Sequence, residues 1–161
     1  MIVIALGANL PSRAGAPRET LSAALRSLSA HDIRLTATSS YYVTKAWPDP
    51  SDPPFVNAVA RVETELLPRE LLVRLHRIEE SFGRKREKKN APRTLDIDLI
   101  AYDDLAMTTA ELILPHPRAL ERAFVLLPLA ELVPERFISG VHISDALARV
   151  DQTGIEKLPP R

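Results

Sequence analysis

Residues 83–98 read Gly-Arg-Lys-Arg-Glu-Lys-Lys-Asn-Ala-Pro-Arg-Thr-Leu-Asp-Ile-Asp, and they join two segments of opposite charge. The first segment, residues 84–93, holds six cations and one anion, follows a glycine and contains Asn-Ala-Pro, which is typical of a loop. We call it the basic loop. The second segment, residues 95–102, reads as a strand. Because strand side chains alternate between faces, Asp96 and Asp98 share one face and the apolar residues share the other.

The two aspartates need a compensating positive charge. Their Cα atoms lie roughly 6.6 Å apart in a strand, and two bare carboxylates at that distance repel by about 2.5 kcal/mol at an effective dielectric constant of 20. One interpretation is a solvated strand face. The other is a magnesium site, since Mg²⁺ takes one or two carboxylates together with phosphate oxygens. The adjoining basic loop favours the second, because metal-assisted phosphoryl transfer needs cations for the polyphosphate and acids for the metal.

Composition narrows the class of protein. The chain has 161 residues, 45% hydrophobic and 26% charged, which is typical of one globular domain spanning residues 1–161. Its formal net charge is zero, whereas a general nucleic-acid binder is more often basic overall. The sequence has no cysteine, no apolar run of membrane-spanning length and no basic leader at the N-terminus. We therefore expect a cytoplasmic monomer with small-molecule substrates and neither nucleic-acid nor membrane partners.

Apolar periodicity and turn residues predict the order of elements. Strands are predicted at residues 2–6, 33–43, 55–64 and 95–102, and helices at residues 17–30 and 68–82. The order β-α-β-β-α-β is that of a ferredoxin-like unit. It predicts an α+β fold with a mostly antiparallel sheet and these two helices on one face.

The rest of the chain is predicted with less regular structure. A short strand is expected at residues 112–114, followed by a helix over residues 119–132 that kinks or splits at Pro128. Residues 137–143 read as irregular. The pair Ser144-Asp145 is predicted to cap a short helix that ends near residue 150, and the C-terminal tail is expected to be frayed.

The sequence resembles the 6-hydroxymethyl-7,8-dihydropterin pyrophosphokinase family of folate biosynthesis over nearly its whole length. The resemblance rests on several blocks that occur in order, the most specific being Pro92-Arg-Thr-Leu-Asp-Ile-Asp98. The other blocks are Ala5-Leu-Gly-Ala-Asn-Leu10, Ser39-Ser-Tyr-Tyr-Val-Thr44, Phe55-Val-Asn57, Glu79 through Phe82-Gly-Arg84, Leu114-Pro-His-Pro-Arg118 and Arg122-Ala-Phe124.

The resemblance implies transfer of the terminal diphosphate of ATP to the pterin hydroxymethyl group, with release of AMP, by a ferredoxin-like α+β fold with helices on both faces. It implies two Mg²⁺ ions held by Asp96 and Asp98, and catalytic roles for Arg84 and Arg93. The ATP contacts that it implies are His76, Glu79, Arg84, Arg86, Arg93, Leu99, His116 and Arg122. The pterin contacts that it implies are Thr44, Lys45, Ala46, Trp47, Phe55, Asn57 and Phe124.

Several of these residues also have simpler interpretations. Asn57 can face solvent in its strand or anchor a heterocycle, because its amide both donates and accepts hydrogen bonds. Phe55 and Phe124 can be core residues or can enclose a flat ring. Two other functions remain open from the residues alone: a two-metal nucleotidyltransferase, and a non-enzymatic ferredoxin-like module that binds anions through the basic loop.

Overall fold

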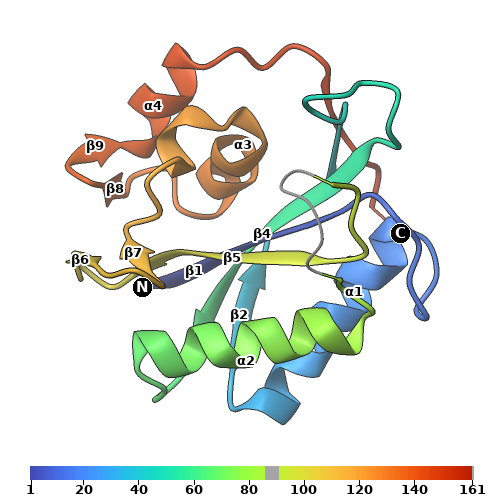
Figure 1. Cartoon of the computed structure of the whole chain (residues 1–161). Coiled ribbons are helices and arrows are strands. Elements are labelled where there is room, and N and C mark those ends of the chain that lie inside the picture. The colour runs from blue at the N-terminus through green and yellow to red at the C-terminus, as the bar shows by residue number, and fades with distance from the viewer. Residues whose placement is uncertain (86–90, 161) are drawn as a thin grey trace.

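The computed structural model describes residues 1–85 and 91–160, and its centre is a six-stranded sheet with helices on both faces (Figure 1). The strand order is β10-β3-β4-β1-β5, and β2 also pairs with β4. Every pairing in this sheet is antiparallel. The strands are β1 (Ile2–Ala8), β2 (Arg34–Thr38), β3 (Tyr42–Thr44), β4 (Phe55–Glu63), β5 (Asp96–Tyr102) and β10 (Ile155–Lys157). The predicted α+β class and three-layer arrangement are confirmed.

The two predicted helices cover one face of the sheet. They are α1 (Pro17–Ser27), extended by a 3-10 turn η1 (Leu28–His31), and α2 (Pro68–Ser81). Each begins with proline, whose fixed φ suits the first helical turn. At the start of α2 the Glu70 carboxylate accepts a hydrogen bond from the Leu67 backbone N–H at 2.8 Å. The apolar stripe of α2 is buried against β5, so this helix is fixed beside the two aspartates.

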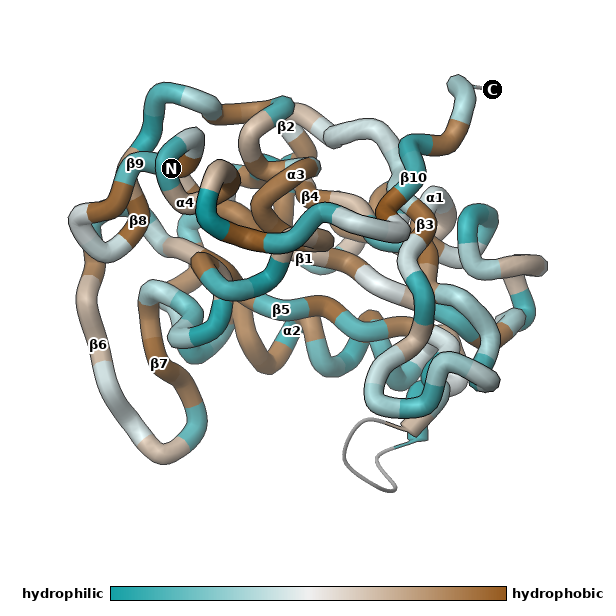
Figure 2. Tube along the Cα trace, turned by 90° about the horizontal axis from the view of Figure 1, so that it is seen from above, coloured by the Kyte–Doolittle hydropathy of each residue, from teal (hydrophilic) through white to brown (hydrophobic). Residues whose placement is uncertain are grey.

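The opposite face is covered by later segments of the chain. These are η2 (Ala119–Glu121), α3 (Ala123–Leu132) and α4 (Ile143–Arg149). A second core forms here, in which Val3, Val59 and Ile100 of the sheet pack with Val125 and Leu129. The apolar character of α3 is visible as a mostly brown tube over the sheet in Figure 2.

The strand register gathers polar residues on this second face. Gly7 of β1 lies opposite Asn57 of β4 on one side and opposite Asp96 of β5 on the other. Directly opposed residues in a sheet point to the same face, and so do residues two apart in one strand. Asp98 and Thr44 therefore share the face of Asn57 and Asp96, which is the face that α3 partly covers.

The strand predicted at residues 33–43 is wrong as a single element. The structure has β2 and β3 there, separated by residues 39–41. Ser39 explains the break, because its hydroxyl accepts a hydrogen bond from the Val59 backbone N–H at 3.0 Å and donates to the Ser40 carbonyl at 2.8 Å. A side chain that bonds nearby backbone groups competes with the regular strand ladder.

The region after β5 also differs from the prediction. The helix predicted at residues 119–132 is divided, but at Arg122, and α3 is continuous across Pro128. The expected strand at 112–114 is β7 (Ile113–Leu114), which pairs with β6 (Met107–Thr108). Residues 137–143, predicted to be irregular, contain a small hairpin of β8 (Phe137–Ile138) and β9 (Val141–His142).

Two expectations for the C-terminal region are wrong. Helix α4 begins at Ile143, so Ser144 lies inside it; its hydroxyl donates to the Pro134 carbonyl at 3.2 Å. The tail is not frayed over residues 155–159, because β10 pairs with β3 and the Leu158 N–H donates to the Tyr41 carbonyl at 2.8 Å. Among the described residues, no helix has the length and apolar character needed to cross a membrane.

Candidate active site at the edge of strand β5

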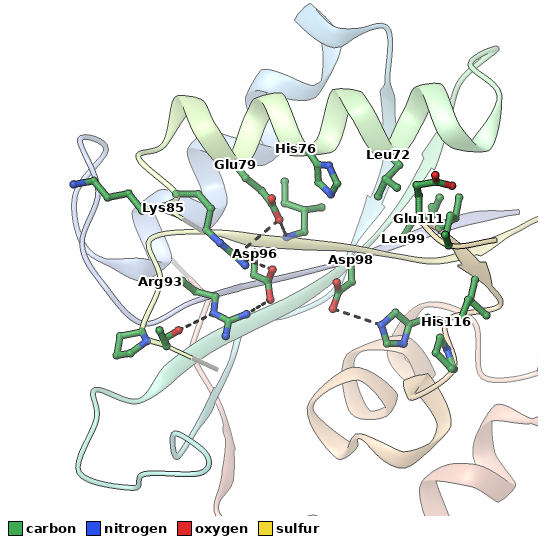
Figure 3. Close-up of a pocket in the computed structure, with 18 residues that line it drawn as sticks. Leu72, His76, Glu79, Lys85, Arg93, Asp96, Asp98, Leu99, Glu111 and His116 are labelled. Atoms are coloured by element: carbon green, nitrogen blue, oxygen red, sulfur yellow. Dashed lines mark hydrogen bonds and ion pairs between the residues drawn. The ribbon is translucent and has the colours of Figure 1, made fainter. Parts of the chain in front are cut away.

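A pocket of about 520 Å³ lies along β5. Helix α2, residues 91–93 before the strand and residues 110–113 after it all contribute to its lining. Its size is that of a typical small-molecule site. Figure 3 shows Asp96 and Asp98 on the same side of β5, with Arg93 reaching Asp96 and His116 facing Asp98. The predicted residues that line it are His76, Glu79, Arg84, Arg93, Asp96, Asp98, Leu99 and His116.

Asp96 is held by two arginines. Arg84 Nη1 donates to one carboxylate oxygen and Arg93 Nη1 to the other, both at 2.7 Å. Burial acts to raise the pKa of this carboxyl, but the two positive charges outweigh burial and the pKa is lowered from its ordinary value. Asp96 is therefore an ionised carboxylate whose charge is neutralised by arginines.

Asp98 has weaker partners. Its Oδ2 lies 3.6 Å from Arg122 Nη1 and 4.0 Å from His116 Nε2, and its side chain is 38% exposed. Burial and the nearby negative charge of Asp96 raise the pKa of Asp98, against the opposing pull of His116 and Arg122. The β5 carboxylates thus differ: one is firmly paired, and the other is more open.

The surroundings of His116 favour its neutral form. Burial lowers its pKa, and the positive charges of Arg122 and Arg118 lower it further, against the attraction of Asp98. Its Nδ1 accepts a hydrogen bond from the Arg118 backbone N–H at 3.1 Å. The proton of the neutral ring therefore lies on Nε2, the atom that faces Asp98.

Glu79 is buried beneath the two aspartates. Its side chain is 4% exposed, and Oε1 accepts a hydrogen bond from the Ile97 backbone N–H at 2.7 Å. Ile97 lies between Asp96 and Asp98, so Glu79 joins the end of α2 to the strand segment that carries both carboxylates. Glu79 Oε1 is also 3.9 Å from Arg84 Nη1.

The residues predicted to bind pterin do not line this pocket. Asn57 Nδ2 donates to Thr44 Oγ1 at 3.0 Å, and both side chains are buried. The two phenyl rings lie next to arginines of the nucleotide set: Arg93 is 5.9 Å from the ring of Phe55, and Arg122 is 5.7 Å from that of Phe124. The two predicted half-sites are therefore contiguous.

The remaining predicted residues have diverse environments. Trp47 is 69% exposed, Lys45 is exposed and Ala46 is buried. Leu99 is almost wholly buried in the core at the wall of the pocket. Arg86 lies outside the described residues.

Asn9 and Gly7 are candidate functional residues that the sequence patterns did not indicate. Asn9 is buried, and its side chain accepts a hydrogen bond from Arg93 N at 2.8 Å and donates to the Pro53 carbonyl at 3.0 Å. It therefore links the segment of Arg93 to the loop that precedes Phe55. Gly7 leaves room for Asn57, because a Cβ at Gly7 would lie 3.2 Å from Asn57 Oδ1.

Comparisons with known proteins identify the family of the chain. The family model for 7,8-dihydro-6-hydroxymethylpterin-pyrophosphokinase (HPPK) matches residues 3–134. A protein of Methylorubrum extorquens named 2-amino-4-hydroxy-6-hydroxymethyldihydropteridine pyrophosphokinase is 40% identical over 156 residues, covering 96% of this chain and 96% of that protein. A Pseudomonas aeruginosa protein of the same name is 39% identical over 160 residues, covering 98% of this chain and 96% of that protein.

Solved structures show the same fold. Wild-type HPPK-DHPS of Plasmodium falciparum with pteroate aligns with a TM-score of 0.69 at 14% identity, covering 92% of this chain. This chain spans 42% of the length of that longer protein. At this identity the structural similarity shows the fold, and the family follows from the family model and the two bacterial relatives. The chain belongs to the 7,8-dihydro-6-hydroxymethylpterin-pyrophosphokinase family.

Proposed function

We propose that this chain transfers the β,γ-diphosphate of ATP to the hydroxymethyl group of 6-hydroxymethyl-7,8-dihydropterin and releases AMP, as a step of folate synthesis. The family assignment supports the reaction. The observation that carries the proposal at the level of residues is the pair of β5 carboxylates at the wall of the pocket, each facing basic side chains.

The arginines would bind the polyphosphate by exchange of partners. Arg84 and Arg93 each donate a hydrogen bond from one guanidinium nitrogen to Asp96, and their side chains are 16% and 19% exposed. Guanidinium binds phosphate oxygens as readily as carboxylate oxygens, and often with two hydrogen bonds. An incoming triphosphate would draw both arginines toward its oxygens. They would then stabilise charge on the transferred group and on the departing AMP.

The same exchange would release Asp96 for a cation. Asp96 and Asp98 are hard oxygen donors on one face of a strand, which suits Mg²⁺. Among residues 1–85 and 91–160 there is no cluster of three or more side chains that could hold a metal ion. The protein therefore offers two carboxylates, and phosphate oxygens would complete the shell, as Mg²⁺ prefers at phosphoryl-transfer sites. When bound there, Mg²⁺ would lower the negative charge that a nucleophile meets at phosphorus.

The pterin would lie on the neighbouring part of the same sheet face. Asn57 and Thr44 offer a buried amide and hydroxyl, whose donors and acceptors suit a heterocycle edge. Phe55 and Phe124 offer ring faces, and each lies near an arginine of the nucleotide side. This placement would bring the hydroxymethyl group toward the β5 carboxylates and the phosphate chain.

An assay that separates AMP from ADP tests the reaction. Incubation with ATP, Mg²⁺ and 6-hydroxymethyl-7,8-dihydropterin should give AMP in a pterin-dependent manner. ADP would instead indicate an ordinary kinase, and absence of both products would favour the binding module.

Substitution of the carboxylates tests their role. Asp96→Ala and Asp98→Ala should each lower turnover by about a hundredfold or more, as removal of one electrostatic group at an active site commonly does. Thermal unfolding should confirm that both variants are folded. Full turnover in both would contradict the proposed metal site.

The assembly and the location of the enzyme are also proposals. We infer a monomer in the cytosol, on the basis of the single domain with its own two cores and the absence of cysteine. Light scattering during gel filtration should give the mass of one chain, 17.9 kDa.

A further inference from the structure

The carboxylate of Glu131 lies outside the pocket, yet it collects four hydrogen bonds from three segments of the chain. It accepts from the Ser40 backbone N–H at 3.1 Å, Ser40 Oγ at 2.7 Å, Tyr42 Oη at 3.1 Å and Lys157 Nζ at 3.2 Å. Its side chain is 31% exposed. Glu131 thus ties α3 to β3, to the turn before β3 and to β10. We call this set the Glu131 junction.

Helix α3 has no other charged side chain between Ala123 and Leu132. Its remaining contacts with the sheet are apolar, through residues such as Val125 and Leu129. Apolar burial is non-directional. The four hydrogen bonds to the Glu131 carboxylate depend on direction as well as distance, so they add a constraint on the position of β3 that apolar burial lacks.

The constrained strand carries part of the pterin side. Strand β3 has only three residues, Tyr42–Thr44, and Tyr42 lies opposite Asn57 in the register with β4. Thr44 ends the strand and accepts the hydrogen bond from Asn57. The position of β3 therefore sets where the Thr44–Asn57 pair lies.

The nucleotide side is distant from the junction. In the sheet order β10-β3-β4-β1-β5, β3 and β5 are three strand spacings apart, or about 14 Å. No hydrogen bond or ion pair among the described residues joins Glu131 to Asp96, Asp98 or their arginine partners. A small shift of β3 would reach Thr44 and leave the β5 carboxylates in place.

We propose that Glu131 is a positioning residue for pterin binding, acting through β3 on the Thr44–Asn57 pair. This inference rests on the proposed function. It predicts that the loss of the junction weakens the binding of pterin selectively.

The test compares Glu131→Gln with wild type in two separate titrations, one with the pterin in the presence of a non-hydrolysable ATP analogue and one with the analogue alone. The pterin Kd should rise about tenfold, the size expected for losing hydrogen bonds to a charged group. The analogue Kd should stay within about twofold, as for distant independent sites. In turnover, KM for the pterin should rise with little change in KM for ATP.

Glu135→Gln is the matched control. Glu135 is three residues past the end of α3 and is 88% exposed, with its carboxylate 3.5 Å from His142 Nε2, so both Kd values should stay at the wild-type level. Tyr42→Phe is a second, milder variant that removes one donor and keeps the ring; it should raise the pterin Kd about threefold. This variant keeps the test decisive if Glu131→Gln does not fold.

The outcomes distinguish a selective role of Glu131 in pterin binding from a general structural role. Equal weakening of both ligands in Glu131→Gln and Tyr42→Phe would show a general structural role and overturn the inference. An unchanged pterin Kd in Tyr42→Phe and Glu131→Gln would overturn it as well. If the wild-type protein itself bound no pterin, the proposed function would fail first.

Discussion

Glu79 is an acidic side chain placed inside the protein, where its carboxylate accepts the Ile97 backbone N–H. Glu79→Ala should lower the free energy of unfolding by about 1–3 kcal/mol, because a buried N–H loses its partner. Activity should also fall, since Asp96 and Asp98 flank Ile97. Urea unfolding measures the first effect and AMP release the second.

The neighbouring Glu80 supplies the control, because it lies on the same helix and is exposed. Glu80→Ala should change stability by no more than about 0.5 kcal/mol. If the two alanine variants were equally stable, the hydrogen bond from Ile97 would have no importance for the fold.

Gly7 makes a second prediction at the residue scale. An added Cβ would lie 3.8 Å from the Phe55 ring, an ordinary contact, but 3.2 Å from Asn57 Oδ1, so Asn57 would have to shift by a few tenths of an ångström. Gly7→Ala should raise the pterin Kd about fivefold to tenfold, a modest overpacking cost. The Kd of an ATP analogue serves as the internal control and should hardly move. An unchanged pterin Kd would mean that Asn57 is not a pterin anchor.

Individual residues of the site were predictable to different degrees. Asp96 and Asp98 follow from strand alternation, because their relation is local in sequence. The roles of Asn9 and Gly7 do not, since they depend on segments brought together by folding: Asn9 bonds to Arg93, 84 positions away, and to Pro53, 44 positions away. No local pattern signals which backbone group a side-chain amide will meet.

At the scale of elements, the contact between α3 and β3 predicts a dependence of stability on pH. Burial and the hydrogen bond to Glu131 raise the pKa of Tyr42 from 10.0 to about 12. Because the pKa of Tyr42 is higher in the folded protein than in the unfolded chain, its protonated hydroxyl contributes to stability in full below pH 10. That contribution is lost as the pH rises from 10 toward 12. Absorbance of tyrosinate should show one tyrosine ionising near pH 12 that Tyr42→Phe removes.

Protonation of Glu131 gives a second dependence of stability on pH, at acid pH and with the opposite sign. Burial opposes ionisation, but hydrogen bonds from Ser40, Lys157 and Tyr42 outweigh it and lower the pKa of Glu131 from 4.5. Its contribution to stability is present above 4.5 and is lost as the pH falls through the lowered value. The stability difference between wild type and Glu131→Gln should therefore be largest near neutral pH and shrink at both extremes. A difference independent of pH would contradict this.

Elements with strong local signals were predicted well, and weaker ones were not. The helices beginning at Pro17 and Pro68 have proline starts and apolar stripes, and both formed as expected. The strand break at residues 39–41 depends on the hydroxyl of Ser39 meeting Val59, a contact between strands. Strand β10 has three residues and forms only because β3 offers it an edge.

At the scale of the whole molecule, the sheet separates two cores and presents the site at their boundary. One core lies under α1 and α2, and the other under α3 and α4. Glu79 approaches β5 from the first layer, whereas Arg122 and Phe124 belong to the second. The substrates would therefore contact both layers and the sheet, so binding should stabilise the whole fold by a free energy that rises with the logarithm of the ligand concentration above its Kd.

The C-terminal segment contains the edge strand β10, and shortening the chain there gives the last prediction. Ending the chain at residue 150 would remove β10, the Lys157 bond to Glu131 and the contact of Arg18 with the Pro159 carbonyl at 2.8 Å. Each lost hydrogen bond contributes about 0.5–1.5 kcal/mol, so the free energy of unfolding should fall by about 2–4 kcal/mol.

Binding should distinguish the two sides of the site in this shortened chain. Because β10 pairs with the strand that ends in Thr44, the pterin Kd should rise, whereas the Kd of an ATP analogue should change little. A chain ending at Leu158 is the control: it keeps β10 and loses only the segment that contacts Arg18, so it should retain wild-type pterin affinity. If both shortened chains bound pterin as the full chain does, β10 would serve stability alone, and the edge of β3 would not need it to hold Thr44 in place.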